Sequence, residues 1–436
     1  MMRAMRGGIL GPPSWRAGRE GADAASDRVD TALGDDAQRS APLWQRRVVT
    51  ALAAVATVLV FAIVLGALCA FIPGLGAFGT VLESFFSVHI FLLGVIAIAL
   101  ALWALRLGGQ RATTVILWLA IASTGCAMIP IGALAGAAQR AGAPISWVDH
   151  LRVSAPGPEA EPNQTLLFAT AGTKPLYTDI YLPGKAGSAT AASAPVVMIH
   201  GGGFTGGTRS IGRDWDRWLA SRGYTVFDVD YRLDPPVSWN FAAQDVACAM
   251  GWVARHAALY NIAPDRMLIA GQSAGGGLAM QVGYGLGDGT VTSSCGGTVP
   301  QPAAIFALYP PDDLAMAWNL KTGIGPVSGR VYNTEYIGGS PEQFPERYRA
   351  VSPIFHVRPG LPPTLIAAGV HDHLVPFGGH VEMVEKLDAA GVANELVSVP
   401  YGDHAYDFAW GSLGGQITRH ALADFLARYL PATSAP

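Results

Sequence analysis

The stretch RMLIAGQSAGG, residues 266–276, decides the fold because a serine stands between two glycines directly after an apolar run. The run predicts a buried strand, and the residues that follow predict a helix. In a tight strand-to-helix turn a Cβ at Gly271 or Gly275 would collide with neighbouring backbone, and the hydroxyl of Ser273 is held above the sheet. The N-terminal dipole of the helix favours negative charge at this point. We therefore predict that Ser273 is a nucleophile.

Two further strands end beside side chains that would activate this serine. A serine hydroxyl attacks efficiently only when a base removes its proton and a third group orients that base. The predicted strand PTLIAAG (363–369) is followed by Asp372, and the predicted strand NELVSVP (394–400) is followed by His404. Because open α/β sheets build their sites at the carboxyl ends of strands, we expect Asp372 and His404 to meet Ser273.

Neighbouring residues offer alternatives for both roles. His371 and His373 flank Asp372 and compete as the base, although residues on the same tight turn as the acid cannot readily reach the serine with the acid behind them. Asp403 and Asp407 compete as the acid, but neither directly follows a strand end. Taken alone, Asp372 is also compatible with capping the following turn, and His404 is compatible with a solvated loop histidine.

The glycine-rich stretch HGGGF, residues 200–204, follows the apolar run VVMI. Acyl transfer places negative charge on a substrate oxygen, and backbone N–H donors approach that oxygen best where no side chain obstructs them. We predict that the amides of Gly202 and Gly203, with that of Ala274, form this oxyanion hole. The alternative is a flexible linker.

Strand-like runs alternate with helical patterns from about residue 145 onward. The runs are 176–182, 194–200, 225–231, 266–271, 303–309, 363–369 and 394–400, and the clearest helical patterns cover 241–260, 380–391 and 416–430. This alternation predicts an α/β catalytic domain over 145–436, with a mostly parallel sheet covered by helices on both faces.

Three apolar runs precede this domain, at Val48–Ile72, Ser84–Leu105 and Thr113–Ala138. Each is long enough as a helix to cross a hydrocarbon core of about 30 Å, so residues 43–140 are expected to form three transmembrane helices. The first run is an alternative candidate for a cleaved signal, but the region before it is long and two more spans follow.

Positively charged residues predict the orientation of these spans. Five arginines lie before the first span or between the second and third: Arg39, Arg46, Arg47, Arg106 and Arg111. By the positive-inside rule they face the cytoplasm, and the catalytic domain is extracytoplasmic, on a plasma (inner) membrane. Arg140 and Arg152 oppose this orientation but are outnumbered.

The composition argues against nucleic-acid binding and leaves one disulfide undecided. Of 436 residues, 50% are hydrophobic and 14% charged, and the net charge of −3 gives no electrostatic footprint for nucleic acid. Residues 1–42 lack apolar periodicity and are expected to be a disordered cytoplasmic tail. Cys248 and Cys295 would pair only in an oxidising compartment, and the sequence does not decide whether they do.

Residues 165–430 resemble the hormone-sensitive-lipase-like and BD-FAE-like branch of α/β-hydrolase serine esterases. The resemblance rests on HGGGF at 200, DYRL at 230, GQSAGG at 271, DHLVP at 372 and GDHAY at 402. It implies an α/β-hydrolase fold and carboxylic ester hydrolysis without cofactor or metal, with the triad in the chain order Ser273, Asp372, His404.

The resemblance also suggests roles for other residues. His200 is expected to brace the glycine loop and Phe204 to line the substrate pocket, while Asp230, Arg232 and Asp245 are expected to form a buried polar network. Two features depart from many relatives: Gln272 stands where an acid is common, and membrane helices replace a cap segment before the domain. Residues 312–350, rich in Gly, Pro and aromatics, are expected to supply a cap as an irregular insertion.

The sequence thus predicts a membrane-anchored serine carboxylesterase acting on a small-molecule or lipid ester at the bilayer. An acyltransferase using the same triad, or a non-catalytic membrane scaffold with a hydrolase-like domain, are the alternatives. Protein partners, acyl length and oligomeric state are not predicted.

Overall fold

The computed structural model describes residues 42–69, 76–152, 161–184, 192–233, 237–322 and 327–432. The expected disordered tail, residues 1–42, lies outside the described residues except for Pro42. Its disorder stays a prediction.

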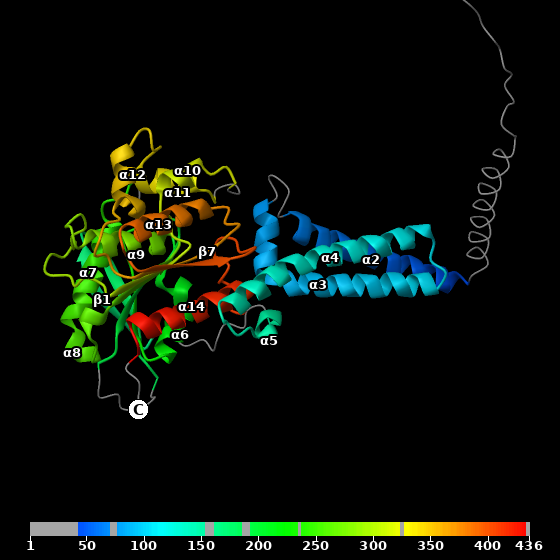
Figure 1. Cartoon of the computed structure of the whole chain (residues 1–436), viewed down its shortest axis with the longest axis horizontal. Coiled ribbons are helices and arrows are strands. Elements are labelled where there is room, and N and C mark those ends of the chain that lie inside the picture. The colour runs from blue at the N-terminus through cyan, green and yellow to red at the C-terminus, as the bar shows by residue number, and fades with distance from the viewer. Residues whose placement is uncertain are drawn as a thin grey trace, which may run out of the picture. The chain divides into compact units, whose positions relative to one another are not determined.

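Three long helices come first in the described chain: α2 (Leu43–Cys69), α3 (Gly76–Arg106) and α4 (Arg111–Arg140) (Figure 1). They contain three segments long and apolar enough to cross a membrane, Leu43–Gly66, Phe78–Arg106 and Arg111–Arg140. The prediction of three candidate spans agrees with these helices. Helix α3 begins before the apolar run at Ser84, and Phe86, with φ −126° and ψ 15°, interrupts its helical conformation.

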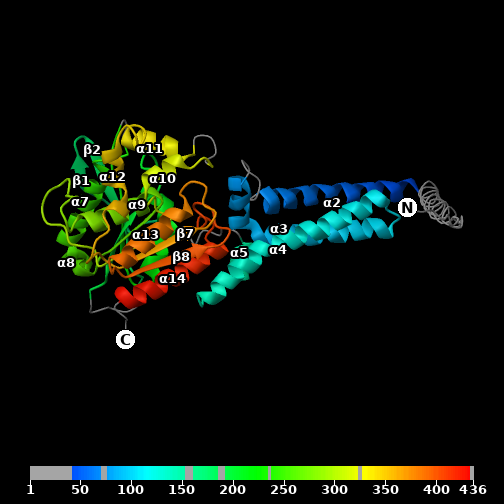
Figure 2. The same ribbon diagram turned by 45° about the horizontal axis from the view of Figure 1, so that its top comes forward.

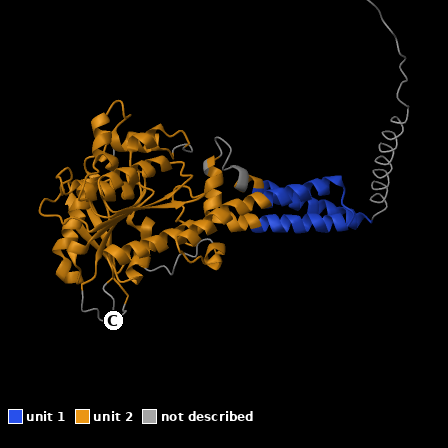
Figure 3. Cartoon of the chain, in the orientation of Figure 1, with its two compact units in different colours: residues 1–63, 92–124 blue, residues 64–91, 125–436 orange. Residues whose placement is uncertain are grey.

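The chain forms two compact units, each with its own internal contacts (Figure 3). One contains residues 1–63 and 92–124, and the other contains residues 64–91 and 125–436. The second unit therefore includes the start of α3 and the end of α4 together with the sheet. The expected division into a membrane region, 43–140, and a catalytic domain, 145–436, stays a prediction.

An eight-stranded sheet has the order β1-β2-β4-β3-β5-β6-β7-β8. Strands β1 and β2 pair antiparallel, β2 pairs antiparallel with β4, and the remaining pairs are parallel. The strands are β1 (Gln164–Ala171), β2 (Lys174–Tyr181), β3 (Pro195–Ile199), β4 (Thr225–Val229), β5 (Leu268–Gln272), β6 (Ala304–Leu308), β7 (Thr364–Gly369) and β8 (Asn394–Val399). The predicted mostly parallel sheet is confirmed.

Helices cover both faces of the sheet because its central strands are apolar on both sides (Figure 2). Val197 and Ile269 face a core shared with α7, α9 and α13, whereas Met198 and Ala270 face a core shared with α6, α14 and the end of α4. The helices after α4 are α5 (Trp147–Leu151), α6 (Arg213–Ser221), α7 (Ala242–Arg255), α8 (Ala257–Tyr260), α9 (Ala274–Gly285), α10 (Leu314–Asn319), α11 (Gly329–Ile337), α12 (Pro345–Val351), α13 (Phe377–Ala389) and α14 (Leu413–Tyr429).

Two elements differ from the sequence expectation. Strand β1 was not predicted, because it is an edge strand whose side chains are mostly exposed and carry little apolar alternation. The insertion at 312–350 was expected to be irregular, and this is wrong, since it contains α10, α11 and α12. Side chains that cap helices explain this structure: Asp313 accepts from Ala315 N and Met316 N, and Ser328 accepts from Val331 N. Whether the insertion acts as a cap stays a prediction.

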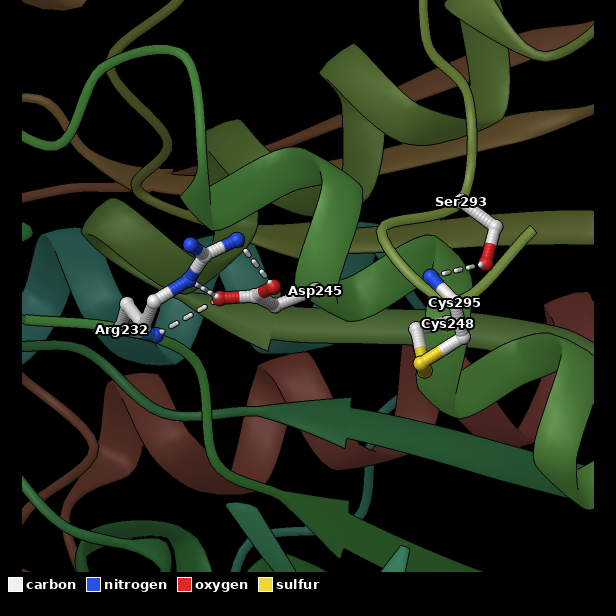
Figure 4. The surroundings of a disulfide bond; sticks show 5 residues. All are labelled: Arg232, Asp245, Cys248, Ser293 and Cys295. Carbon is white, nitrogen blue, oxygen red and sulfur yellow. Dashed lines mark hydrogen bonds and ion pairs between the residues drawn. A yellow bond between two sulfur atoms is a disulfide. The ribbon is translucent and has the colours of Figure 1, made fainter. Parts of the chain in front are cut away.

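Cys248 of α7 forms a disulfide with Cys295, which the sequence left open (Figure 4). On the same helix, Asp245 accepts hydrogen bonds from Arg232 Nε at 2.6 Å and Nη2 at 2.7 Å. Asp230 does not join this pair and instead contacts Arg209. Arg209 also pairs with Asp179 at 3.2 Å, so the expected network is divided into two groups, Arg232 with Asp245 and Arg209 with Asp179 and Asp230.

Candidate active site

Ser273 lies in the turn between β5 and α9, in a backbone conformation with φ 53° and ψ −122°. This left-handed conformation is strained for a residue with a side chain. The flanking glycines are needed for the turn, because a Cβ on Gly271 would lie 2.3 Å from the carbonyl carbon of Gly275, and one on Gly275 would lie 2.1 Å from Ile199 O. Ser273 N donates to Leu308 O at 2.9 Å, which fixes the turn against β6.

The structure brings the side chains of His404 and Asp372 to this serine. His404 Nε2 lies 2.8 Å from Ser273 Oγ, and His404 Nδ1 lies 2.7 Å from Asp372 Oδ2. Because a carboxylate only accepts hydrogen bonds, Nδ1 carries the proton and Nε2 is free to accept from the hydroxyl. The other oxygen of Asp372 accepts from Leu374 N at 2.8 Å and Val375 N at 2.7 Å. The acid is thus fixed from both sides.

The loops after β7 and β8 approach each other through two glycines. A Cβ on Gly369 would lie 2.3 Å from Gly402 O, so only a glycine permits this approach. His371 N donates to Gly402 O at 3.0 Å across the same contact. This contact explains why residues 372 and 404, on separate loops, reach one point.

The environment of His404 favours its protonated form. Burial lowers the pKa of His404, but the charge of Asp372 and its hydrogen bond, together with the charges of Asp403 and Asp407, raise it above its ordinary value overall. The side chain is 16% exposed, while that of Asp372 is fully buried. An imidazole with a raised pKa is well suited to accept a proton from a serine hydroxyl.

The glycine loop lies beside Ser273. A Cβ on Gly201 would be 3.3 Å from Ser273 Cβ, while Gly202 has φ +126° and Gly203 has φ +63°, both in the region that favours glycine. Within the described residues, the amides of Gly202, Gly203 and Ala274 donate no backbone hydrogen bond. These three N–H groups are therefore available to a ligand, as an oxyanion hole requires.

The alternative histidines are engaged elsewhere. His371 stacks on Tyr401 with ring centroids 5.0 Å apart. His373 Nδ1 lies 3.2 Å from Asp403 Oδ2, and the hydrogen bond to this carboxylate raises the pKa of His373. Among the described residues, the histidine that contacts Ser273 Oγ is His404 and not His371 or His373.

The alternative acid Asp407 is held behind the site by three donors. Trp215 Nε1 and Tyr309 OH each lie 2.6 Å from its oxygens, and Gln272 Nε2 lies 3.0 Å away. The last of these contacts gives Gln272, the residue before Ser273, a hydrogen-bond partner. The ring centroids of Tyr309 and His404 lie 4.7 Å apart. Asp407 therefore holds the tyrosine against which the imidazole packs.

Two residues of the glycine loop are buried. His200 Nδ1 donates to Gly201 O at 2.8 Å, and its ring stacks on Tyr231 at 4.5 Å, which agrees with the expected bracing role. Phe204 is 4% exposed and stacks on Tyr336 of α11 with ring centroids 4.0 Å apart. Contact of Phe204 with substrate stays a prediction.

Among the described residues, no group of three or more His, Cys, Asp or Glu side chains is arranged to hold a metal ion. A hydroxyl, an imidazole and a carboxylate in series can transfer a proton and form a covalent acyl intermediate.

The fold and the sequence comparison define the class of the protein. Residues 178–387 match the family model BD-FAE, and this range includes the glycine loop, the serine turn and Asp372. Together with the mostly parallel sheet and its helices, this match, which covers just under half of the chain, shows an α/β-hydrolase domain that is similar to those of esterases.

Individual relatives are esterases. The chain is 27% identical to esterase LipQ of Mycobacterium tuberculosis over 53% of its own length and 55% of the relative, and 27% identical to esterase LipC of the same organism over 53% and 58%. It thus spans about half the length of these curated relatives. A solved esterase of Thermogutta terrifontis with bound propionate is similar over 64% of this chain and 98% of that one, with 26% identity and a TM-score of 0.50.

Proposed function

We propose that the protein is a membrane-anchored serine carboxylesterase with Ser273 as nucleophile, His404 as base and Asp372 as orienting acid. The observation that carries the proposal is the continuous hydrogen-bonded chain from Ser273 Oγ through His404, with distances of 2.8 Å and 2.7 Å. The esterase relatives support the same reaction class.

In the first half of the reaction, Ser273 Oγ attacks the ester carbonyl carbon while His404 Nε2 takes the hydroxyl proton. The carbonyl oxygen becomes negatively charged and accepts hydrogen bonds from the amides of Gly202, Gly203 and Ala274. When the carbon–oxygen bond to the alcohol breaks, His404 gives its proton to the leaving alkoxide. The product is an acyl-serine and a free alcohol.

In the second half, a water molecule attacks the acyl carbon and gives a proton to His404. The bond between the acyl carbon and Ser273 Oγ then breaks, and the serine oxygen regains the proton from the imidazolium. The carboxylic acid leaves. Asp372 remains ionised throughout and stabilises the charged imidazole.

The substrate we propose is a small ester with a short acyl chain, or a lipid ester reached from the bilayer. The neighbour with propionate in its structure supports a short acyl group. The three apolar helices support a position at a membrane, where the local concentration of lipid esters is high.

The domain is proposed to lie outside the cytoplasm, on a plasma (inner) membrane. Arginines before the first span and between the second and third favour the cytoplasm. The disulfide between Cys248 and Cys295 supports the same placement, because disulfides persist in oxidising compartments. Reporters fused after Pro436 test this orientation. A reporter that works only outside the cytoplasm should be active. Activity of a reporter that works only inside the cytoplasm would contradict the orientation.

The activity is tested on the full chain in detergent with p-nitrophenyl esters of increasing acyl length. Hydrolysis with a preference for short chains is expected, and Ser273→Ala should abolish it. A folded wild type that hydrolyses none of the esters and does not react with a fluorophosphonate would instead indicate a non-catalytic scaffold. Adding an alcohol distinguishes a transferase, since it would form a new ester faster than free acid.

A further inference from the structure

The loop that carries His404 is strained on both sides of the histidine. Tyr401 has φ 54° and Ala405 has φ 60°, although neither is a glycine. Left-handed conformations of such residues persist only where surrounding contacts enforce them. The loop therefore needs an external support to hold the imidazole in place.

Asp403, adjacent to His404, organises this loop. Its Oδ1 accepts from His404 N at 2.6 Å and from His373 N at 3.0 Å, and its side chain is 4% exposed. The carboxylate thus joins the histidine loop to the loop that carries Asp372. Whatever fixes Asp403 also fixes the relative position of the base and the acid.

The first turns of α3 hold Asp403 from both its backbone and its side chain. Thr80 Oγ1 donates to Asp403 Oδ2, and Ser84 Oγ accepts from Asp403 N at 2.9 Å. Ser84 Oγ also lies 3.2 Å from Tyr401 O, at one of the strained positions. Thr80 and Ser84 are one helical turn apart, so both hydroxyls lie on one face of the helix.

These contacts are enclosed within one compact unit. Residues 64–91 and 125–436 form that unit, so the start of α3 and the histidine loop belong to the same body. Thr80 is fully buried and Ser84 is 6% exposed. The helix is interrupted shortly afterwards at Phe86, which separates the turns that contact the loop from the rest of α3.

We propose that Thr80 and Ser84 are positioning residues that hold the His404 loop in its catalytic conformation, so that a helix of the membrane region completes the active site. This inference rests on the proposed esterase function. Neither hydroxyl touches the reacting atoms; both act through Asp403, and Ser84 acts also through Tyr401. Losing either contact lets the strained loop relax and lengthens the average distance from His404 Nε2 to Ser273 Oγ. Small displacements of a catalytic group are costly, up to about 100-fold in rate for about 1 Å.

The test uses the full chain in detergent with Thr80→Val and Ser84→Ala. Each variant should lower kcat at least about tenfold and leave KM unchanged, because the base is displaced while the substrate contacts remain. Labelling by a fluorophosphonate should slow in parallel. Thr80→Ser keeps the hydroxyl and should restore kcat, which a purely steric role of the threonine would not explain.

Matched controls exist in the other helices. Thr57→Val and Ser123→Ala remove hydroxyls that bond only to backbone of their own helices, at Ala53 O, Leu119 O and Ala120 O. Both controls should keep wild-type kcat. Thermal unfolding of every variant shows whether a lower kcat comes from displacement of His404 or from unfolding of the domain.

Several results would overturn the proposal. Equal kcat in Thr80→Val, Ser84→Ala and their controls would show that the contacts do not position the base. Failure of both variants to fold would also contradict it, since the proposal assigns them a local role. An inactive wild type would overturn the proposed function instead, so the two failures are distinguishable.

Discussion

The serine turn and the histidine loop both hold strained residues, yet they are held in different ways. The turn at Ser273 is enforced by glycines two residues away on either side. The loop at His404 is contacted by the hydroxyls of Thr80 and Ser84, more than 300 residues earlier in the sequence, with separations of 323 and 319 from Asp403. A local motif therefore encodes the turn of the proposed nucleophile, whereas tertiary contacts surround the loop of the proposed base.

The largest expected effect concerns the acid that orients the base. Asp372→Asn should lower kcat by about 10⁴-fold, because the imidazole would adopt the wrong tautomer while the geometry survives. The measurement is ester hydrolysis at saturating substrate. Asp388→Asn, at the exposed end of α13, is the control and should keep full activity. If Asp372→Asn lowers kcat by less than tenfold, a carboxylate other than Asp372 orients the imidazole of His404.

The second largest effect tests whether the turn at Ser273 requires its flanking glycines. Gly275→Ala should destabilise the domain by about 4 kcal/mol or more, since its Cβ would lie 2.1 Å from Ile199 O, a backbone atom that cannot move aside. Gly378→Ala is the matched control, because a Cβ there meets nothing within 4 Å. Chemical denaturation of the two variants measures the difference. Equal stability would mean that the turn does not require its glycine.

Removing the disulfide should change stability without changing the site. Cys248 and Cys295 are separated by 47 positions, and closing a loop of that length stabilises the folded chain by about 4 kcal/mol. The double variant Cys248→Ala, Cys295→Ala should unfold at lower temperature and retain kcat at temperatures where it is folded. A reduced wild type should behave in the same way. If kcat falls while the fold is intact, the disulfide also shapes the site.

The smallest effect is a pH dependence of the base. Burial lowers the pKa of His404, but Asp372, Asp403 and Asp407 raise it above the ordinary 6.5 overall. Since only the neutral imidazole accepts the serine proton, kcat/KM should fall as pH decreases through the raised pKa, with its midpoint above 6.5. A midpoint below 6.5 would contradict this electrostatic account.

The contribution of His404 to folding stability should change with pH in the opposite direction to the activity. A raised folded pKa contributes stability that is fully present below the unfolded pKa and is lost as pH rises through the folded pKa. Activity lost on mild acidification should therefore not reflect unfolding caused by this group. Intrinsic fluorescence recorded over the same pH range provides the control.

Much of the fold was predictable because its signals are local. The strands from β2 to β8 are expected from apolar and β-branched runs, and Asp372 and His404 are expected from the ends of two of these strands. Strand β1 was missed because an exposed edge strand carries little apolar pattern. Asp313 and Ser328 are residue types that are typical of helix N-caps, so they are a sequence signal for α10 and α11.

The support from α3 gave no usable signal in the sequence. A threonine and a serine near the start of an apolar run are compatible with any membrane helix, where such hydroxyls commonly bond to their own backbone. Their partners on the loop at 401–404 are defined only by the tertiary structure. Local patterns therefore predicted the candidate triad residues, while the contacts that position one of them required the structure.

The central claim is tested most directly by mapping the covalent adduct of a fluorophosphonate on the full chain by peptide mass spectrometry. The account predicts one adduct, on Ser273, that does not form in Ser273→Ala and forms more slowly in Thr80→Val than in Thr57→Val. An adduct on another residue, or none in a folded wild type, would contradict it.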